Sequence, residues 1–511
     1  MSSLSFFREH KLLLSIAFAK FLLHVAINLG GAYGYFRDEL YYIACSNHLA
    51  WGYVDQPPVS IFLLAISRIL FGDSLVMLRI LPAVAGSITV LFVGLIAEKM
   101  GGRKFAQATA AIAALASFVW LGMDSYYSMN AIDILIWSIS FYLICVIING
   151  GRPRNFILLG VVLGIGLMNK IDVLWLGLGI AAGLVLTEQR RWLRTRWPWI
   201  CGAIALAMFL PFVVWNIANG NPHLEFMRNA TSQKYSTLNA LSFAKDQLLE
   251  QNPAALPLWL AGLVSLFTPR GAKYRLLGII YVTGFAVLIA NGHSKGEYLS
   301  PAYGALFAAG AVTVEQWTER NALRWIRFAL PGVIGVFAIV FLPLILAVLP
   351  VESYIRYAEA IGFAPDNPEH KKLDKLPQFY ADRFGWQEKT EMVARAYMSL
   401  PGSDRARCAI YSDNYGRCAA IDFFGKKYHL PPAIGSHNNY WLWGYDGYDG
   451  SVVIILGGKL QDQQSAFDSV EVFGVVSSPY CMPYENDLAV YVCRGLRKPL
   501  RDLWPALKHY E

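Results

Sequence analysis

Residues 12–33 read LLLSIAFAKFLLHVAINLGGAY, an apolar run whose one formal charge at pH 7 is Lys20. A helix needs about 20 mainly apolar residues to cross roughly 30 Å of hydrocarbon, so this run predicts a membrane span. Further apolar stretches follow it as far as residue 349. The expected fold class is therefore a polytopic α-helical membrane protein with about eleven transmembrane helices. The predicted spans are 12–33, 76–97, 105–122, 131–148, 155–169, 173–187, 198–217, 254–269, 276–291, 299–314 and 328–349.

The composition changes at Pro350. Charged residues make up 16% of the 511-residue chain, well below the roughly 25% of ordinary soluble domains. Residues 1–350 hold 26 Lys and Arg and 16 Asp and Glu, whereas residues 351–511 hold 18 and 20. We therefore predict two domains: a transmembrane domain over 1–350 and a soluble domain over 351–511. The high apolar content excludes intrinsic disorder.

The distribution of Lys and Arg predicts the orientation in the membrane. With the N terminus inside, inner loops collect 17 basic residues against eight on the outer side, and cytoplasmic loops are the ones that retain Lys and Arg. An odd number of spans then places the 351–511 domain outside. The expected location is the cell inner membrane, with a cytoplasmic N terminus and a periplasmic C-terminal domain.

The first outer loop carries charged residues and a short apolar segment. It contains Arg37-Asp38-Glu39 and, further on, Asp55-Gln56-Pro57-Pro58, and then enters Val59–Phe71. That segment is too short to span and suits a helix lying in the membrane interface. An ionised carboxylate at the end of a membrane span costs free energy, so its presence there suggests a function. The alternative is that Asp38 caps a helix starting at Glu39.

These residues resemble the first periplasmic loop of glycosyltransferase family 39, which includes the protein-O-mannosyltransferases and the bacterial aminoarabinose transferases that modify lipid A. The resemblance implies the GT-C architecture of membrane-embedded glycosyltransferases and a polyprenyl-phosphate-linked sugar donor used at the outer membrane face. It covers most of the chain, through Ser128–Asp133, Gly166–Lys170, Lys295–Pro301, Asn414–Gly416, His437–Gly444 and Pro483–Asn486.

The resemblance also implies roles for the acidic residues. Asp38 is expected to act as the carboxylate nearest the acceptor, with Glu39 beside it as a second carboxylate or metal ligand. Asp133 matches the acidic position of the second loop, where it would orient the partners of Asp38 or hold a divalent cation. The alternative to these roles is that Asp133 is a solvated residue in the first turn of a helix. The sequence identifies no cofactor with certainty, and it does not decide whether a divalent metal cation is bound.

Two outer-side lysines are candidate ligands for the phosphate of the lipid donor. Lys170 and Lys295 lie where the positive-inside rule leaves few cations, and Lys is a common point-charge partner of phosphate. The alternative is a lysine snorkelling to the interface. Tyr298 and Asp55, which belong to the same family motifs, are expected to bind substrate. His293 could donate to phosphate or ligate a metal, or be merely polar surface.

The C-terminal domain is predicted to be a small α/β domain with two disulfides. Short β-prone runs at 408–411, 451–456, 470–476 and 488–493 alternate with helical patterns. Disulfides persist outside the cytoplasm, and local spacing favours pairing Cys408 with Cys418 and Cys481 with Cys493. The alternative is four buried thiols.

The sequence therefore predicts an integral-membrane glycosyltransferase. Its partners would be a polyprenyl-phosphate sugar, membrane lipid and an extracytoplasmic acceptor, which could be lipid A, another glycan or protein. Nothing points to nucleic acid. A transporter or flippase of lipid-linked sugars is the alternative, although it should place paired ionisable residues at mid-span, where Lys20 is a partial exception. An oligosaccharyltransferase would share the architecture. The sequence contains no Walker A motif, no GxGxxG in a strand–helix context and no HExxH. A nucleotide-driven pump or a soluble nucleotide-sugar transferase therefore has no support.

Overall fold

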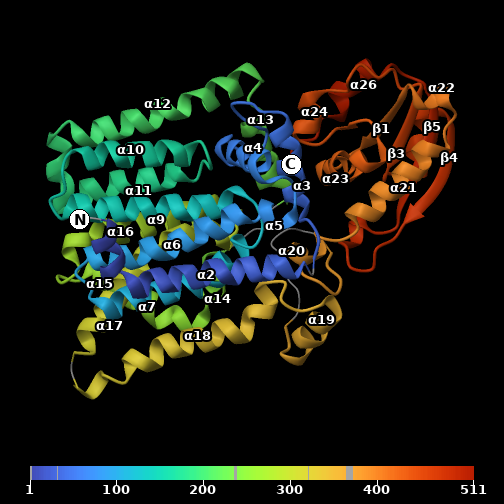
Figure 1. Cartoon of the computed structure of the whole chain (residues 1–511). Helices are drawn as coiled ribbons and strands as arrows, with labels where there is room; N and C mark the ends of the chain where they lie inside the picture. The colour runs from blue at the N-terminus through green and yellow to red at the C-terminus, as the bar shows by residue number, and fades with distance from the viewer. Residues whose placement is uncertain (1–2, 32, 235–238, 320, 364–371) are drawn as a thin grey trace.

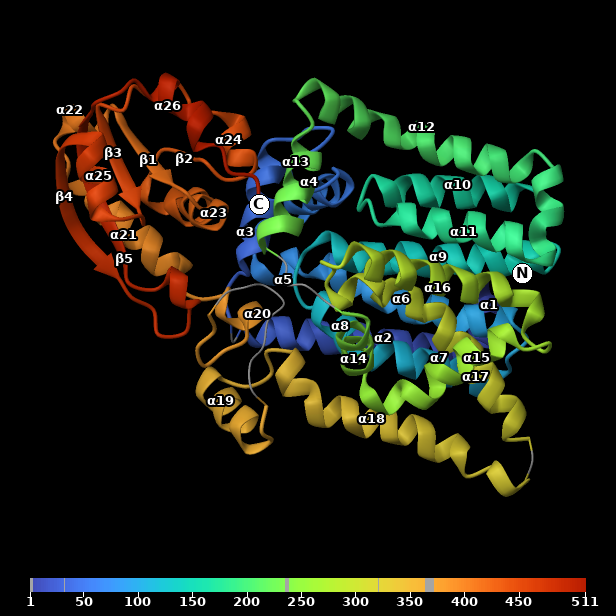
Figure 2. The same cartoon turned by 180° about the vertical axis from the view of Figure 1, so that it is seen from behind.

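The computed structural model describes residues 3–31, 33–234, 239–319, 321–363 and 372–511. A long bundle of helices is joined at one end to a smaller part built on a β-sheet (Figure 1). The N terminus lies at the far end of the bundle, away from the sheet (Figures 1 and 2). The bundle is a membrane domain by length and composition, because six of its helical segments are long and apolar enough to cross a bilayer.

The helices of the bundle and of the segment that follows it are α1 (Ser3–Glu9), α2 (Lys11–Gly30), α3 (Arg37–Asn47), α4 (Val59–Phe71), α5 (Leu75–Leu78), α6 (Ile80–Lys99), α7 (Lys104–Leu115), α8 (Phe118–Met123), α9 (Met129–Ile148), α10 (Arg154–Leu167), α11 (Val173–Leu186), α12 (Trp197–Ala218), α13 (Pro222–Asn229), α14 (Ala240–Glu250), α15 (Leu256–Phe267), α16 (Arg275–Asn291), α17 (Tyr303–Trp317), α18 (Ile326–Ile345), α19 (Val351–Ala360) and α20 (Gln378–Ala381). The six long segments are Lys11–Gly30, Leu75–Lys99, Met129–Ile148, Trp197–Ala218, Ala272–Asn291 and Ile326–Ile345.

The other five predicted spans are shorter or interrupted helices. Segments α10, α11 and Pro253–Phe267 are apolar but have fewer than 18 residues. The predicted span 105–122 is broken between α7 and α8 at Ala116 and Ser117, and the span 299–314 begins as a 3-10 helix over Gly296–Ala302 before α17. Hydropathy locates these segments correctly, but it cannot show where the helix is interrupted.

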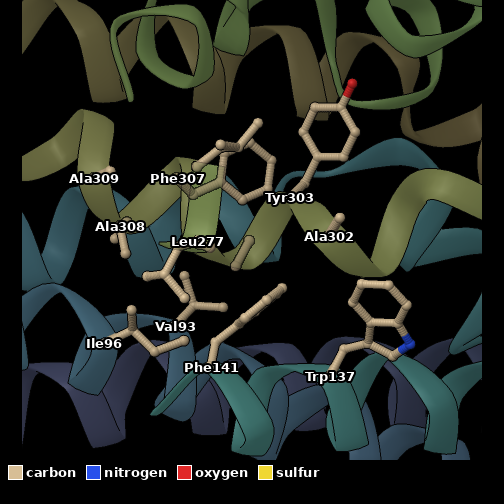
Figure 3. Packing of buried hydrophobic residues seen from close by; sticks show 14 of the residues in the cluster. Val93, Ile96, Trp137, Phe141, Leu277, Ala302, Tyr303, Phe307, Ala308 and Ala309 are labelled. Atoms are coloured by element: carbon tan, nitrogen blue, oxygen red, sulfur yellow. The ribbon is translucent and has the colours of Figure 1, made fainter. Parts of the chain in front are cut away.

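Helix α17 lies at the centre of the bundle. Its small residues are buried, and Figure 3 shows Phe307, Ala308 and Ala309 in the same packed cluster as Val93 of α6 and Phe141 of α9. Neighbouring α15 approaches so closely that a Cβ at Gly310 of α17 would lie 2.0 Å from the Leu258 carbonyl oxygen. Small residues allow such close helix packing within a membrane.

The C-terminal part contains a five-stranded sheet in the order β2-β1-β3-β5-β4. Strand β1 is parallel to β2 and β3, and β5 is antiparallel to β3 and β4. Helices α21 and α23 cover one face and α26 covers the other. The elements are α21 (Trp386–Ser399), α22 (Gly402–Arg405), β1 (Cys408–Ser412), α23 (Tyr415–Phe424), β2 (Ala433–Gly435), α24 (Asn439–Trp443), β3 (Val452–Leu456), α25 (Leu460–Ala466), β4 (Phe467–Val476), β5 (Leu488–Leu496) and α26 (Leu500–Leu507).

The two predicted disulfides are not formed, and all four cysteines are buried free thiols. Cys418 lies at the Ser412 end of β1, where its Sγ contacts the Ser412 carbonyl oxygen, whereas Cys408 begins that strand. Four residues of strand separate these two ends by about 13 Å, beyond disulfide reach. Cys493 faces α26, whereas Cys481 lies beside Gly385 at the start of α21, which covers the opposite face of the sheet.

A shared core joins the sheet to the bundle. The buried cluster on the α21 and α23 face of the sheet continues into Leu40, Tyr41 and Ile43 of α3 and into Leu64 of α4. Residues from both parts of the chain therefore pack together around the first outer loop, next to the site described below.

Candidate functional site

A cavity of about 430 Å³ lies where the bundle meets the sheet-bearing part. Its walls come from α3, the segment before α9, the α10–α11 connection, α13, the segment after α16 and the C-terminal part. In Figures 1 and 2, α3, α13 and α23 gather at this junction. The polar lining includes Arg37, Asp38, Tyr41, Asp55, Gln56, Asn130, Lys170, Asp172, His223, His293, Lys295, Glu297, Tyr298, Tyr415, Asn438 and Glu511.

Asp38 lines this cavity from the first turn of α3. The helix begins at Arg37 with Phe36 as its N-cap residue, so Asp38 is not the cap. Its Oδ1 accepts hydrogen bonds from Arg37 Nε at 3.3 Å and from the Tyr415 hydroxyl at 2.8 Å. Within the described ranges, no residue donates a hydrogen bond to Oδ2. Asp38 thus has one anchored and one available oxygen, as a general base requires.

Glu39 has a different position from the one predicted. It is fully buried and does not line the cavity. Its carboxylate accepts hydrogen bonds from Arg79 Nε at 2.8 Å and from Arg79 Nη2 at 2.7 Å. The backbone amides of Phe36 and Tyr127 donate to the same carboxylate at 2.9 and 2.8 Å. With both oxygens engaged, Glu39 holds the loop around Asp38 and is not a second carboxylate or metal ligand in the site.

Lys170 lines the cavity between two carboxylates. Its Nζ lies 3.3 Å from Asp133 Oδ2 and 2.9 Å from Asp172 Oδ2, and the Tyr298 ring centre is 5.4 Å away. Burial alone would lower the pKa of Lys170, but the charges of Asp172 and Asp133 outweigh it and raise the pKa above its ordinary value. Lys170 is therefore a permanent cation at the cavity wall.

Asp133 is placed behind Lys170 rather than beside Asp38. It is completely buried and does not line the cavity. Asp133 was predicted to orient the partners of Asp38, but the structure places it in contact with Lys170, whose charge it balances.

The remaining predicted ligands all line the same cavity. Lys295, His293 and Tyr298 come from the segment after α16, and Asp55 accepts a hydrogen bond from the Tyr41 hydroxyl at 3.1 Å. Residues distant in sequence thus line one cavity with both lysines and carboxylates.

The arrangement does not fit the predicted metal ligands. Glu39 is paired with Arg79 and Asp133 with Lys170, and neither lines the cavity. In the described part of the chain, no group of three or more His, Cys, Asp and Glu side chains could hold a metal ion.

Tyr415, Arg37 and His223 are three of the cavity residues to which sequence reasoning gave no role. Tyr415 contacts Asp38 from the C-terminal part, and Arg37 donates to the Tyr484 hydroxyl at 2.8 Å as well as to Asp38. His223 donates from Nδ1 to the Val54 carbonyl oxygen at 3.0 Å, and burial lowers the pKa of His223 to about 4. The Asn414–Gly416 motif was a signal for Tyr415, but nothing in the sequence paired it with Asp38.

The family comparison covers the first part of the bundle. Residues 55–215 match the family described as dolichyl-phosphate-mannose-protein mannosyltransferase. No curated protein matches the chain by sequence.

Solved structures share the fold over nearly the whole chain. ArnT from Cupriavidus metallidurans bound to undecaprenyl phosphate is similar with a TM-score of 0.62 and 11% identity, over 94% of this chain and 97% of that one. The apo oligosaccharyltransferase of Archaeoglobus fulgidus gives a TM-score of 0.51 at 14% identity, over 85% and 65%. AglB from Archaeoglobus fulgidus in complex with an inhibitory peptide and a dolichol-phosphate gives 0.51 at 12% identity, over 88% and 70%.

These findings confirm the predicted fold class and the resemblance on which it was based. The chain has the GT-C fold of membrane glycosyltransferases, with a dolichyl-phosphate-mannose-protein mannosyltransferase match over residues 55–215.

Proposed function

We propose that this protein transfers a sugar from a polyprenyl-phosphate donor to an acceptor at the extracytoplasmic membrane face. The observation that carries this proposal is a single cavity in which the free oxygen of Asp38 and the cations Lys170 and Lys295 occur together. Lipid A, another glycan or a protein is the acceptor class, and the sugar is a hexose or a pentose.

The residues suit the two halves of such a reaction. Asp38 Oδ2 takes the proton of the acceptor hydroxyl as its oxygen attacks the anomeric carbon, and the bond from that carbon to the phosphate oxygen breaks. The electron pair of that bond stays with the polyprenyl phosphate. Fixed positive charge from Lys170 and Lys295 stabilises this leaving group as its charge develops.

The lipid carrier is supported by the solved structures. ArnT from Cupriavidus metallidurans was solved with undecaprenyl phosphate and archaeal AglB with a dolichol-phosphate. Both ligands are polyprenyl-type phosphates, and the fold is shared. The phosphate of such a carrier would lie beside Lys170 and Lys295, which line the cavity.

The proposed orientation has the N terminus in the cytoplasm and residues 351–511 outside the inner membrane as a separate domain. The basic connection between α11 and α12, with Arg190, Arg191 and Arg194, lies at the N-terminal end of the bundle, opposite the sheet (Figure 1). The positive-inside rule favours placing that end in the cytoplasm.

The test is release of polyprenyl phosphate by the purified protein reconstituted in lipid with a panel of polyprenyl-phosphate sugars and acceptors. The Asp38→Asn variant should lose on the order of 10²–10⁴ in turnover while keeping its melting temperature and donor binding. Asp73→Asn is the matched control, because Asp73 is similarly exposed but paired with Arg68 away from the cavity. Wild-type turnover by Asp38→Asn would overturn the assignment.

A further inference from the structure

We propose that Tyr415 is a positioning residue for Asp38, so that the C-terminal part of the chain completes the active site of the membrane domain. This inference rests on the proposed function, in which Asp38 is the base. It adds a residue that lies 377 positions away in sequence and belongs to the sheet-bearing part.

The contact is direct and enclosed. The Tyr415 hydroxyl donates to Asp38 Oδ1 at 2.8 Å, and Tyr415 is 7% exposed. Its ring centre lies 4.6 Å from that of Tyr41 and 4.8 Å from that of His437, and the Arg37 guanidinium carbon is 5.3 Å from it. These contacts with two aromatic rings and a guanidinium leave the phenol little freedom to move away from Asp38.

This contact decides which oxygen of Asp38 is available. Rotation about the bond to a carboxylate is soft, so a lone aspartate presents either oxygen in many orientations. Arg37 and Tyr415 both donate to Oδ1, which fixes the carboxylate plane and leaves Oδ2 for the acceptor proton. Efficient proton transfer needs such a held geometry.

The local fold of the C-terminal part serves this contact. Tyr415 is the first residue of α23, and the Asn414 side chain caps that helix by accepting from the Gly416 amide at 2.8 Å. A Cβ at Gly416 would lie 2.5 Å from Arg37 Cγ. The start of α23 is therefore packed directly against the turn that carries Asp38.

The kinetic test compares Tyr415→Phe with wild type in the lipid-reconstituted transfer assay. Loss of one hydrogen bond to a charged group should lower kcat on the order of tenfold, with an unchanged KM for the lipid donor. The acid limb of the kcat–pH profile should move to higher pH, because a proton then competes with one hydrogen bond fewer for the carboxylate.

Tyr440→Phe is the matched control. Tyr440 is a buried tyrosine of the same part of the chain whose hydroxyl donates to Asp422 at 2.6 Å, and it does not line the cavity. Removing the Tyr440 hydroxyl should leave both kcat and the acid limb of the kcat–pH profile unchanged. Equal effects of the two variants, or an unshifted acid limb in Tyr415→Phe, would overturn the positioning role.

A second readout needs no transfer activity. A carbodiimide modifies protonated carboxyls, so its labelling of Asp38 as a function of pH, measured by mass spectrometry, reports on the Tyr415 contact directly. The pH at the labelling midpoint should rise in Tyr415→Phe and should be the same as in wild type in Tyr440→Phe. An unchanged midpoint in Tyr415→Phe would refute the inference. Absence of transfer by the wild-type protein would instead refute the proposed function, and the labelling would still decide whether Tyr415 controls Asp38.

Discussion

At the scale of single residues, some charged groups line the cavity and others form ion pairs outside it. Asp38 and Lys295 line the cavity, whereas Glu39 is neutralised by Arg79 outside it. Lys20 of α2 is also paired, because its Nζ lies 2.6 Å from Asp124 Oδ2 and both side chains are buried. Each ion of this pair is stabilised by the charge of the other, and neither lines the cavity.

Lys295 offers the cleaner test of phosphate binding. Replacing Lys170 would leave Asp133 and Asp172 buried without their cation and would cost stability. Lys295→Met should raise the KM for the lipid donor and lower turnover by roughly tenfold or more, about 1.4 kcal/mol. Steady-state kinetics with donor as the varied substrate measures this. Lys498→Met is the control, because Lys498 is exposed. If Lys295→Met had the same kinetics as this control, Lys295 would extend to the membrane interface without binding the donor phosphate.

Glu485 predicts how the stability of the C-terminal part depends on pH. Burial alone would raise the pKa of Glu485, but Arg417 and Lys389 outweigh it and lower the pKa to about 2. Because the pKa is depressed relative to 4.5 in the unfolded chain, the stabilisation is complete above about pH 4.5. It is lost as the pH falls towards about 2.

The unfolding midpoint followed by tryptophan fluorescence should therefore decline over this range. Trp386 is a suitable reporter, since its ring centre lies 4.3 Å from Lys389 Nζ. Glu485→Gln should be less stable at pH 7 and should flatten the decline, whereas the exposed Glu471→Gln should behave as wild type. An equally steep decline in Glu485→Gln would exclude this ion pair as the cause.

At the scale of elements, the contact between α3 and α23 matters most. These helices belong to opposite ends of the chain and meet in one buried cluster. Arg37 lies at the contact, where it donates to Asp38 and Tyr484. Positions that allow the two helices to approach should affect both stability and turnover.

Gly416 is such a position. Alanine there would place a Cβ 2.5 Å from Arg37 Cγ and 3.0 Å from its Cδ, so Arg37 must shift. We expect Gly416→Ala to lose about 1–3 kcal/mol in unfolding free energy and to lower turnover. Thermal unfolding and the transfer assay measure the two effects. Gly402→Ala is the control, because nothing lies within 4 Å of its Cβ position; matching results for the two variants would contradict the close approach.

At the scale of the whole molecule, the fold places the cavity at one end of the bundle and the N terminus at the other (Figure 2). Helix α4 lies beside that cavity end with Ile66, Ile69 and Leu70 exposed, as an interfacial helix requires. A lipid donor held in the bilayer could thereby present its phosphate to the lysines.

This arrangement predicts opposite membrane sides for two surface positions. Arg191 and Gln464 are exposed, whereas all seven native cysteines are buried and should label weakly. In intact cells, a membrane-impermeant maleimide should label Gln464→Cys and spare Arg191→Cys, and it should label both after permeabilisation. The reverse pattern would invert the proposed orientation.

The sequence by itself determined the membrane character of the chain, the positions of its apolar segments and the residues from which a site could be built. Hydropathy and charge are local properties, so Asp38, Lys170 and Lys295 could be selected from motifs and loop positions. All three line one cavity.

Only the tertiary structure decided which of the candidate residues meet. Glu39 pairs with Arg79, 40 residues away, and Tyr415 reaches Asp38 from 377 residues away. The cysteines were predicted to pair by closeness in sequence, but β-strands separate neighbours along their length and alternate residues between two faces. Such outcomes depend on long-range packing, in which a side chain is placed by elements that its own sequence neighbourhood does not contain.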